Sequence, residues 1–150
     1  SRSISPEAYL QIVKNLSQKY NLILFAEEPF FQKEDTYTFK AQTDLRGWSA
    51  IIEGSDYFIG CDSVGQHMAR AFNKPGFVII GSTYPINTTY PDYFTIWEKS
   101  EAKKYSPIRI CGLDAHLADR YNDTCMDLTP EQVTEVCKLI VKDIETKVGR

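Results

Sequence analysis

The stretch Tyr57–Pro85, YFIGCDSVGQHMARAFNKPGFVIIGSTYP, carries two apolar runs with a polar, glycine-containing stretch between them. The stretches YFIGC and GFVIIGS have the length of strands and are apolar without polar alternation, which is typical of strands covered on both faces. The residues between them predict a short helix, VGQHMARAFN. We expect four of its side chains to face inward: Val64, Met68, Ala71 and Phe72. A strand, a helix and a strand in this order predict a parallel unit.

The alternation of helices and strands continues on both sides of this unit. Further helices are predicted over residues 5–20, 44–55 and 129–149, and further strands over residues 21–27 and 36–42, with a fifth candidate strand at 106–112. Residues 83–94 predict a turn-rich loop. The first helix has Ser5 as its N-cap, and the last begins with a capping box of Thr129 and Gln132. The chain therefore predicts an α/β fold, a single Rossmann-like domain over residues 1–150 with a parallel β-sheet flanked by helices.

Composition excludes several classes of protein. The 150 residues are 43% hydrophobic and 25% charged, as in a globular domain. The net charge of −3 argues against a nucleic-acid partner. No apolar run approaches the roughly 18 residues of a transmembrane segment, and no secretory signal is visible. The chain lacks a starting Met, so we expect either a trimmed chain or a piece of a longer protein.

The cysteines predict buried, reduced thiols rather than a metal or redox site. No C-x-x-C pair occurs among Cys61, Cys111, Cys125 and Cys137. The cysteines show no zinc-ligand spacing with His67 or His116. A disulfide between the second and third cysteines stays open as an alternative.

The polar stretch Asp62–Gly65 lies where a predicted strand leads into a helix, the place at which such folds bind ligands. Free N–H groups and the helix dipole favour an anion there, and Gly65 would let the backbone approach it. Ser63 either caps the helix or donates to a phosphate. Asp62 either accepts bonds from loop N–H groups or holds a sugar hydroxyl. His67 either reaches the anion or packs as a structural histidine.

Three familiar motifs are absent from the sequence. It has no G-x-G-x-x-G fingerprint, which argues against an ordinary NAD site. It has no G-x-x-x-x-G-K-[ST] loop, and no G-x-S-x-G elbow of an α/β-hydrolase.

The central stretch resembles the C-terminal domain of the lipopolysaccharide heptosyltransferases, glycosyltransferase family 9. That family typically reads Asp-[Ser/Thr]-Gly-x-x-His-x-Ala-x-Ala, a short gap, Pro, a strand and Gly-x-Thr-x-Pro. The matching positions here are Asp62, Ser63, His67, Ala69, Ala71, Pro75, Gly81, Thr83 and Pro85. Val64 departs from the pattern, because the family usually has glycine there and this chain has its glycine at Gly65. The resemblance extends weakly over most of residues 5–145.

The resemblance implies one half of a GT-B fold, the half that binds the nucleotide-sugar donor. The donor phosphates would meet Asp62, Ser63, Val64, Gly65, His67 and Thr83. The nucleoside would meet Glu27, Glu28 and Thr43. The enzyme would be an inverting, metal-independent glycosyltransferase of cell-envelope polysaccharide synthesis without a cofactor. It would act in the cytoplasm or at the inner face of the membrane, on a glycan or glycolipid acceptor.

The same resemblance leaves the catalytic residue outside this chain. The base would come from an N-terminal GT-B half, so we expect the isolated chain to be inactive. Two alternatives stay open. One is a non-catalytic binding or interaction domain with a degenerate GT-B half, and the other is a domain like a sugar-nucleotide epimerase.

Overall fold

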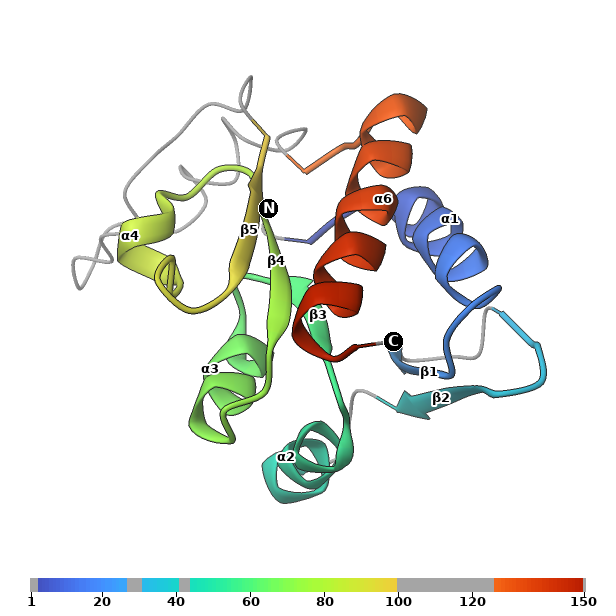
Figure 1. Ribbon diagram of the computed structural model, residues 1–150, viewed down its shortest axis with the longest axis horizontal. Coiled ribbons are helices and arrows are strands. Elements are labelled where there is room, and N and C mark those ends of the chain that lie inside the picture. The colour runs from blue at the N-terminus through green and yellow to red at the C-terminus, as the bar shows by residue number, and fades with distance from the viewer. Residues whose placement is uncertain (1–2, 27–30, 41–43, 100–125, 150) are drawn as a thin grey trace, which may run out of the picture.

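The structure is a computed structural model that describes residues 3–26, 31–40, 44–99 and 126–149. The elements in chain order are α1 (Pro6–Leu16), β1 (Leu22–Ala26), β2 (Thr36–Lys40), α2 (Leu45–Gly54), β3 (Phe58–Cys61), α3 (Val64–Ala71), β4 (Gly76–Ile80), α4 (Pro85–Thr88), β5 (Thr95–Glu98) and α6 (Pro130–Lys147). The strands pair in parallel and helices flank them (Figure 1). The predicted α/β fold of Rossmann-like character is therefore confirmed.

The strands form two small sheets rather than one continuous sheet. β3, β4 and β5 pair in that order, with β4 in the middle, and β1 pairs with β2 separately. Figure 1 shows the β1–β2 ribbon apart from β3, below α1. Ile23 and Tyr37 are register partners in this ribbon and are 46% and 64% exposed. The face of the ribbon that carries these two side chains is therefore not fully covered.

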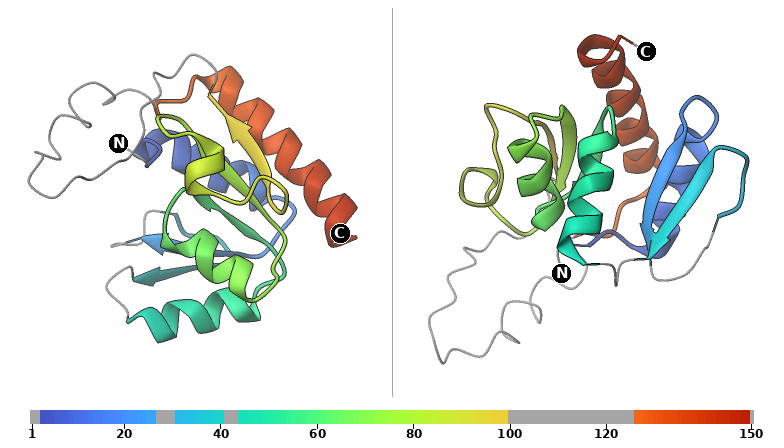
Figure 2. Two further views of the ribbon diagram at one scale, coloured as in Figure 1. Left: turned by 90° about the vertical axis from the view of Figure 1, so that its left-hand side faces the viewer. Right: turned by 90° about the horizontal axis from the view of Figure 1, so that it is seen from below.

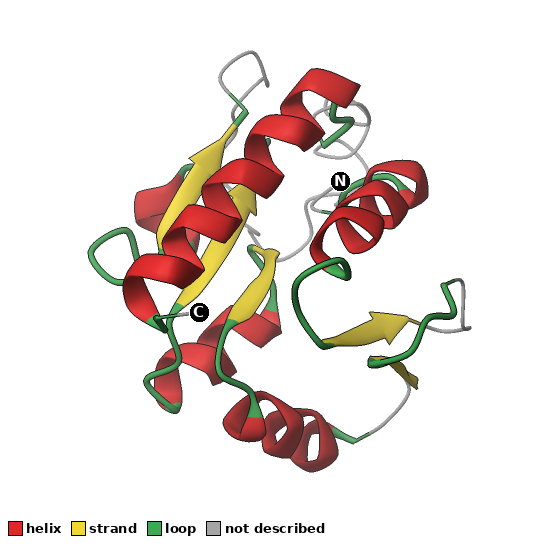
Figure 3. Cartoon of the chain, turned by 45° about the vertical axis from the view of Figure 1, so that its right-hand side comes forward, coloured by secondary structure: helices red, strands yellow, loops and turns green. Residues whose placement is uncertain are grey.

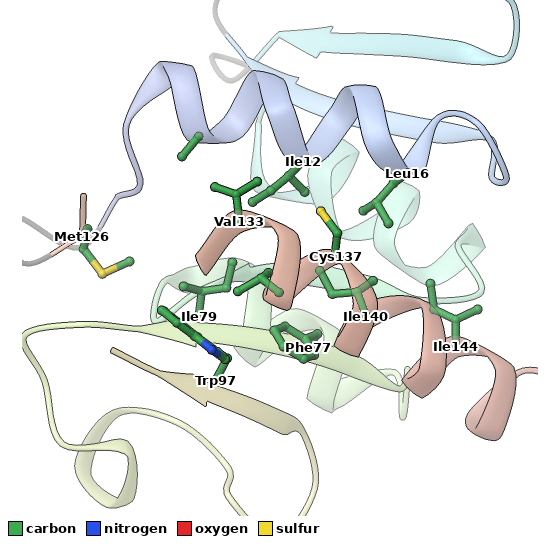
Figure 4. Close-up of a cluster of buried hydrophobic side chains, with 12 residues drawn as sticks. Ile12, Leu16, Phe77, Ile79, Trp97, Met126, Val133, Cys137, Ile140 and Ile144 are labelled. Atoms are coloured by element: carbon green, nitrogen blue, oxygen red, sulfur yellow. The ribbon is translucent and has the colours of Figure 1, made fainter. Parts of the chain in front are cut away.

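β4 is the centre of the packing, since all five of its residues are buried. Successive side chains of a strand point to opposite faces. Phe77 and Ile79 pack with α1 and α6, and Figure 4 shows this cluster of buried side chains. Val78 and Ile80 pack on the other face with residues of α2 and α3. Covering both faces explains why the strand is apolar without alternation.

The helices that cover the first face lie next to one another. α6 runs across β4 and β5 in Figure 3, and the two views of Figure 2 show α1 alongside it. The predicted caps of both helices are confirmed: Ser5 accepts from the Ala8 N–H at 3.2 Å, and Thr129 and Gln132 form the reciprocal capping box. None of the helices in the described ranges is long and apolar enough to cross a membrane.

The predicted inward face of α3 is partly wrong. Val64 is 40% exposed and Ala71 is also exposed, whereas Gly65, Gln66 and Ala69 are buried. The small residues Gly65 and Ala69 lie one turn apart and form the face that packs closely on the sheet. This close packing turns α3 so that Val64 and Ala71 lie at its outer margin.

The region predicted as a loop carries a short helix, and the strand after it was not predicted. α4 lies within residues 83–94, and β5 (TIWE) follows and pairs with β4. A four-residue strand leaves too short a pattern to separate from the loop before it. The candidate strand at 106–112 lies outside the described residues.

Candidate functional site

Two polar side chains meet where β3 and β4 end. Asp62 directly follows β3, and Thr83 lies three residues beyond β4. The Thr83 hydroxyl donates to a carboxylate oxygen of Asp62 at 2.6 Å, and the two residues are 1% and 4% exposed. Thr83 therefore turns towards Asp62 rather than into open solvent, where we expected it to meet a donor. Asp62 accepts this bond from a side-chain hydroxyl, whereas the two roles expected for it were bonds from loop N–H groups and a bond to a sugar hydroxyl.

Ser63 occupies the N-cap position of α3 without capping it. Its backbone is extended, with φ −131° and ψ −176°, and its side chain makes no capping hydrogen bond to the described part of the chain. Ser5, Asp44 and Thr129 in contrast each accept a bond from the first turn of their own helices. Ser63 is exposed. The first turn of α3 thus keeps N–H groups that its N-cap side chain does not use, and these groups with the helix dipole favour an anion.

Gly65 has a packing role that the sequence did not indicate. A Cβ atom at this position would lie 3.0 and 3.1 Å from two ring carbons of Phe58. Gly65 therefore lets α3 approach the β3 side chain, and this contact explains the glycine without an anion beside it. Val64, which follows Ser63 as the first residue of α3, has an exposed side chain.

His67 is exposed, so it is not a histidine packed in the core. Its Nδ1 atom lies 2.8 Å from the Tyr90 hydroxyl, and the two rings meet edge to face with their centroids 5.6 Å apart. One turn further along α3, the Arg70 guanidinium lies over the Tyr93 ring, 4.2 Å from its centroid. The Tyr90 hydroxyl therefore engages the Nδ1 atom of His67 and orients its ring.

Gln66 is a buried polar residue that the sequence reasoning missed. It is fully buried, and its Nε2 atom donates to the backbone oxygen of Thr88 in α4 at 2.7 Å. Its Oε1 atom has no hydrogen-bond partner among the described residues. The sequence carries a signal for this burial. Gly65 and Ala69 are small residues one turn apart, which indicates the side of the helix that packs closely, and Gln66 stands between them.

Thr88 connects Gln66 to the pair at the strand ends. The Thr88 hydroxyl lies 3.3 Å from Thr83 Oγ1 and 3.2 Å from the Tyr84 oxygen, and its single proton serves one of them at a time. We call Asp62, Gln66, Thr83 and Thr88 the polar cluster.

The nearest thiol is not a nucleophile at neutral pH. Cys61 precedes Asp62, and burial, the largest cause, raises its pKa to about 11. Burial also raises the pKa of Cys137, and both cysteines are free thiols. Cys111 and Cys125, the pair left open for a disulfide, lie outside the described residues. Within the described ranges, no group of three His, Cys, Asp or Glu side chains could hold a metal ion.

Two open hollows lie away from the polar cluster. One, of about 560 Å³, is lined by residues 31–34 and 36–38, and the other, of about 430 Å³, lies between α1 and α6. Neither is lined by a member of the polar cluster. The residues expected to meet the nucleoside, Glu27, Glu28 and Thr43, lie outside the described part of the chain.

Comparison of the chain with protein-family models, with curated proteins and with solved structures gave no match in any of the three.

Proposed function

We propose that the chain is the donor-binding domain of a glycosyltransferase, similar to the heptosyltransferases, that holds a nucleoside-diphosphate sugar. The observation that carries the proposal is the junction of β3 and α3. A helix whose N-cap side chain makes no cap follows a parallel strand directly, and exposed Ser63 and His67 flank its first turn. Open α/β sheets bind ligands at this end of their strands, and helix N-termini suit a diphosphate without a cation.

The proposed chemistry is an inverting transfer. The acceptor oxygen forms a bond to the anomeric carbon while the bond from that carbon to the diphosphate oxygen breaks, and the diphosphate leaves with the electron pair. The N–H groups at the start of α3 stabilise the growing charge. His67 would lie beside the leaving diphosphate, on the wrong side to take the proton from the acceptor hydroxyl in an in-line displacement. The proton therefore goes to a base on a second Rossmann-like domain, so the isolated domain transfers no sugar.

This role also defines the partners. The donor needs no cofactor or metal, since α3 supplies the positive end of a helix dipole. A glycan or glycolipid acceptor would approach from the second domain. The enzyme would act in the cytoplasm or at the inner face of the membrane, where free thiols such as Cys61 and Cys137 stay reduced.

A second candidate is a non-catalytic binding or interaction domain that has lost the chemistry. Two observations favour it: Val64 stands where the resembled family has glycine, and Asp62 and Thr83 are bonded to each other rather than open to a donor. This candidate predicts that α3 binds no nucleoside diphosphate.

The test is an NMR titration of ¹⁵N-labelled protein with ADP, UDP and GDP. Half of a two-domain cleft should bind weakly, with a Kd near ~1 mM. At least one diphosphate should shift the backbone amides of residues 63–67, and Ser63→Ala should weaken that response. Thr146→Val is the matched control, because its exposed hydroxyl donates to Lys142 O of its own helix and it lines neither hollow. If millimolar diphosphate moves none of these amides, the proposal fails.

A further inference from the structure

α4 is held over the polar cluster by hydrogen bonds and not by packing. None of its four residues is buried, and Ile86 is 82% exposed. The bonds that link it to α3 and to the end of β4 come from Thr88, through its backbone oxygen to Gln66 and through its hydroxyl to Thr83. A segment with little buried apolar surface opens at a low cost in free energy, because its opening exposes little apolar surface to water.

The groups under α4 are rich in hydrogen-bond acceptors. Gln66 Oε1 belongs to the same amide as the Nε2 atom bonded to Thr88, so it lies at the end of α4. It is buried without a partner among the described residues, as is Thr89 Oγ1. A buried acceptor without a donor is costly and gains strongly from one.

The Asp62 carboxylate decides the chemistry of the ligand. Its oxygen accepts the hydrogen bond from the Thr83 hydroxyl, and an ionised carboxylate can only accept. Asp62 and Gln66 Oε1 therefore favour a neutral ligand that donates several hydrogen bonds. Sugar hydroxyl groups have this chemistry.

We propose that α4 is a displaceable cover and that the polar cluster beneath it binds the hydroxyl groups of the transferred sugar. The inference rests on the proposed function, with the diphosphate at the N-terminus of α3. When α4 moves outward, a sugar hydroxyl donates to Gln66 Oε1, and a second hydroxyl takes the place of the Thr88 hydroxyl at Thr83. The cover closes the cluster to water when no ligand is bound.

Amide hydrogen exchange tests the cover without a ligand. The Asn87 and Thr89 N–H groups bond to Tyr84 and Pro85 oxygens within the same segment. These two amides should exchange at least about 100-fold faster than those of Val78 and Ile80 in β4. Equal protection in α4 and β4 would overturn the cover.

The ligand part is tested by comparing diphosphates with their sugar conjugates. ADP, UDP and GDP are titrated beside ADP-glucose, UDP-glucose and GDP-mannose. A conjugate should shift the NMR signals of the Gln66 side-chain amide and of residues 84–89, whereas its diphosphate alone should leave these signals unshifted. The conjugate should also slow amide hydrogen exchange in α4. It should also bind about tenfold more tightly than its diphosphate.

Two variants separate the contributions of the cluster. Gln66→Met should remove the tenfold gain of the conjugate and leave diphosphate binding within about twofold. Thr88→Val should speed exchange in α4 and raise the affinity for the conjugate, because one closing bond is lost, whereas Thr146→Val should do neither.

The outcomes distinguish this inference from the proposed function. If diphosphates shift residues 63–67 but no conjugate adds a shift at Gln66 or α4, the inference is wrong and the proposed function stands. If nothing shifts residues 63–67, the proposed function fails and this inference fails with it.

Discussion

Replacing Thr83 by valine removes one hydroxyl from the centre of the polar cluster and little else. Valine has almost the same shape, and Thr83 is 1% exposed, so the change leaves no large cavity. The lost group is the donor to Asp62 at 2.6 Å, and Asp62 is itself only 4% exposed. The variant therefore keeps a buried carboxylate and takes away one of its donors.

The expected cost follows from that geometry. A hydrogen bond to a charged group contributes about 1.5–3 kcal/mol, and a buried acceptor that loses its donor pays its desolvation penalty. We expect Thr83→Val to lower the free energy of unfolding by about 2 kcal/mol. For a chain of this length, Tm should fall by about 4–8 °C.

Urea unfolding followed by circular dichroism measures the loss, with thermal unfolding as a second readout. With an m-value of about 2 kcal/mol per molar, the midpoint should move down by about 1 M. Thr146→Val is the control, since its exposed hydroxyl donates to Lys142 O of its own helix, and it should stay within about 0.5 kcal/mol of the parent. A Thr83→Val protein as stable as this control would refute the idea that Asp62 depends on Thr83.

Three further predictions concern the packing and the buried thiol. Gly65→Ala should lower the free energy of unfolding by up to about 2 kcal/mol, because overpacking against Phe58 exceeds the gain of about 1 kcal/mol in helix propensity. Thermal unfolding measures this loss, and adding Phe58→Leu should recover part of it. Tyr57→Phe should cost about 1–2 kcal/mol in urea unfolding, because the Tyr57 hydroxyl donates to the Asp143 carboxylate on α6, and no loss would mean that this bond is not formed. The unfolding free energy should fall as pH rises from about 9 to about 11, because the folded state keeps the Cys61 proton that the unfolded state releases. The decline should be smaller in Cys61→Ala, and an equal decline would assign it to other groups.

Long and strongly periodic elements could be predicted from the sequence because local pattern and packing agree in them. The capping box of Thr129 and Gln132 begins α6, and its apolar face packs where the spacing indicates. The continuous apolar run of β4 predicted a strand covered on both faces, and Phe77 and Val78 point to opposite clusters.

The rest depends on contacts that no local pattern carries. The rotation of α3 follows from the fit of Gly65 on Phe58, a residue on another element. β5 is only four residues long, and its place in the sheet is decided by pairing with β4. Gln66 is polar and lies on the buried side, so a rule that places apolar residues inward passes over it.

The most direct test of the account is a crystal structure of the domain with ADP, UDP or GDP bound. We expect diphosphate oxygens within hydrogen-bond distance, about 2.7–3.2 Å, of backbone nitrogens in the first turn of α3, with Ser63 beside them. A diphosphate bound instead in the hollow lined by residues 31–34 and 36–38, or in the hollow between α1 and α6, would contradict it.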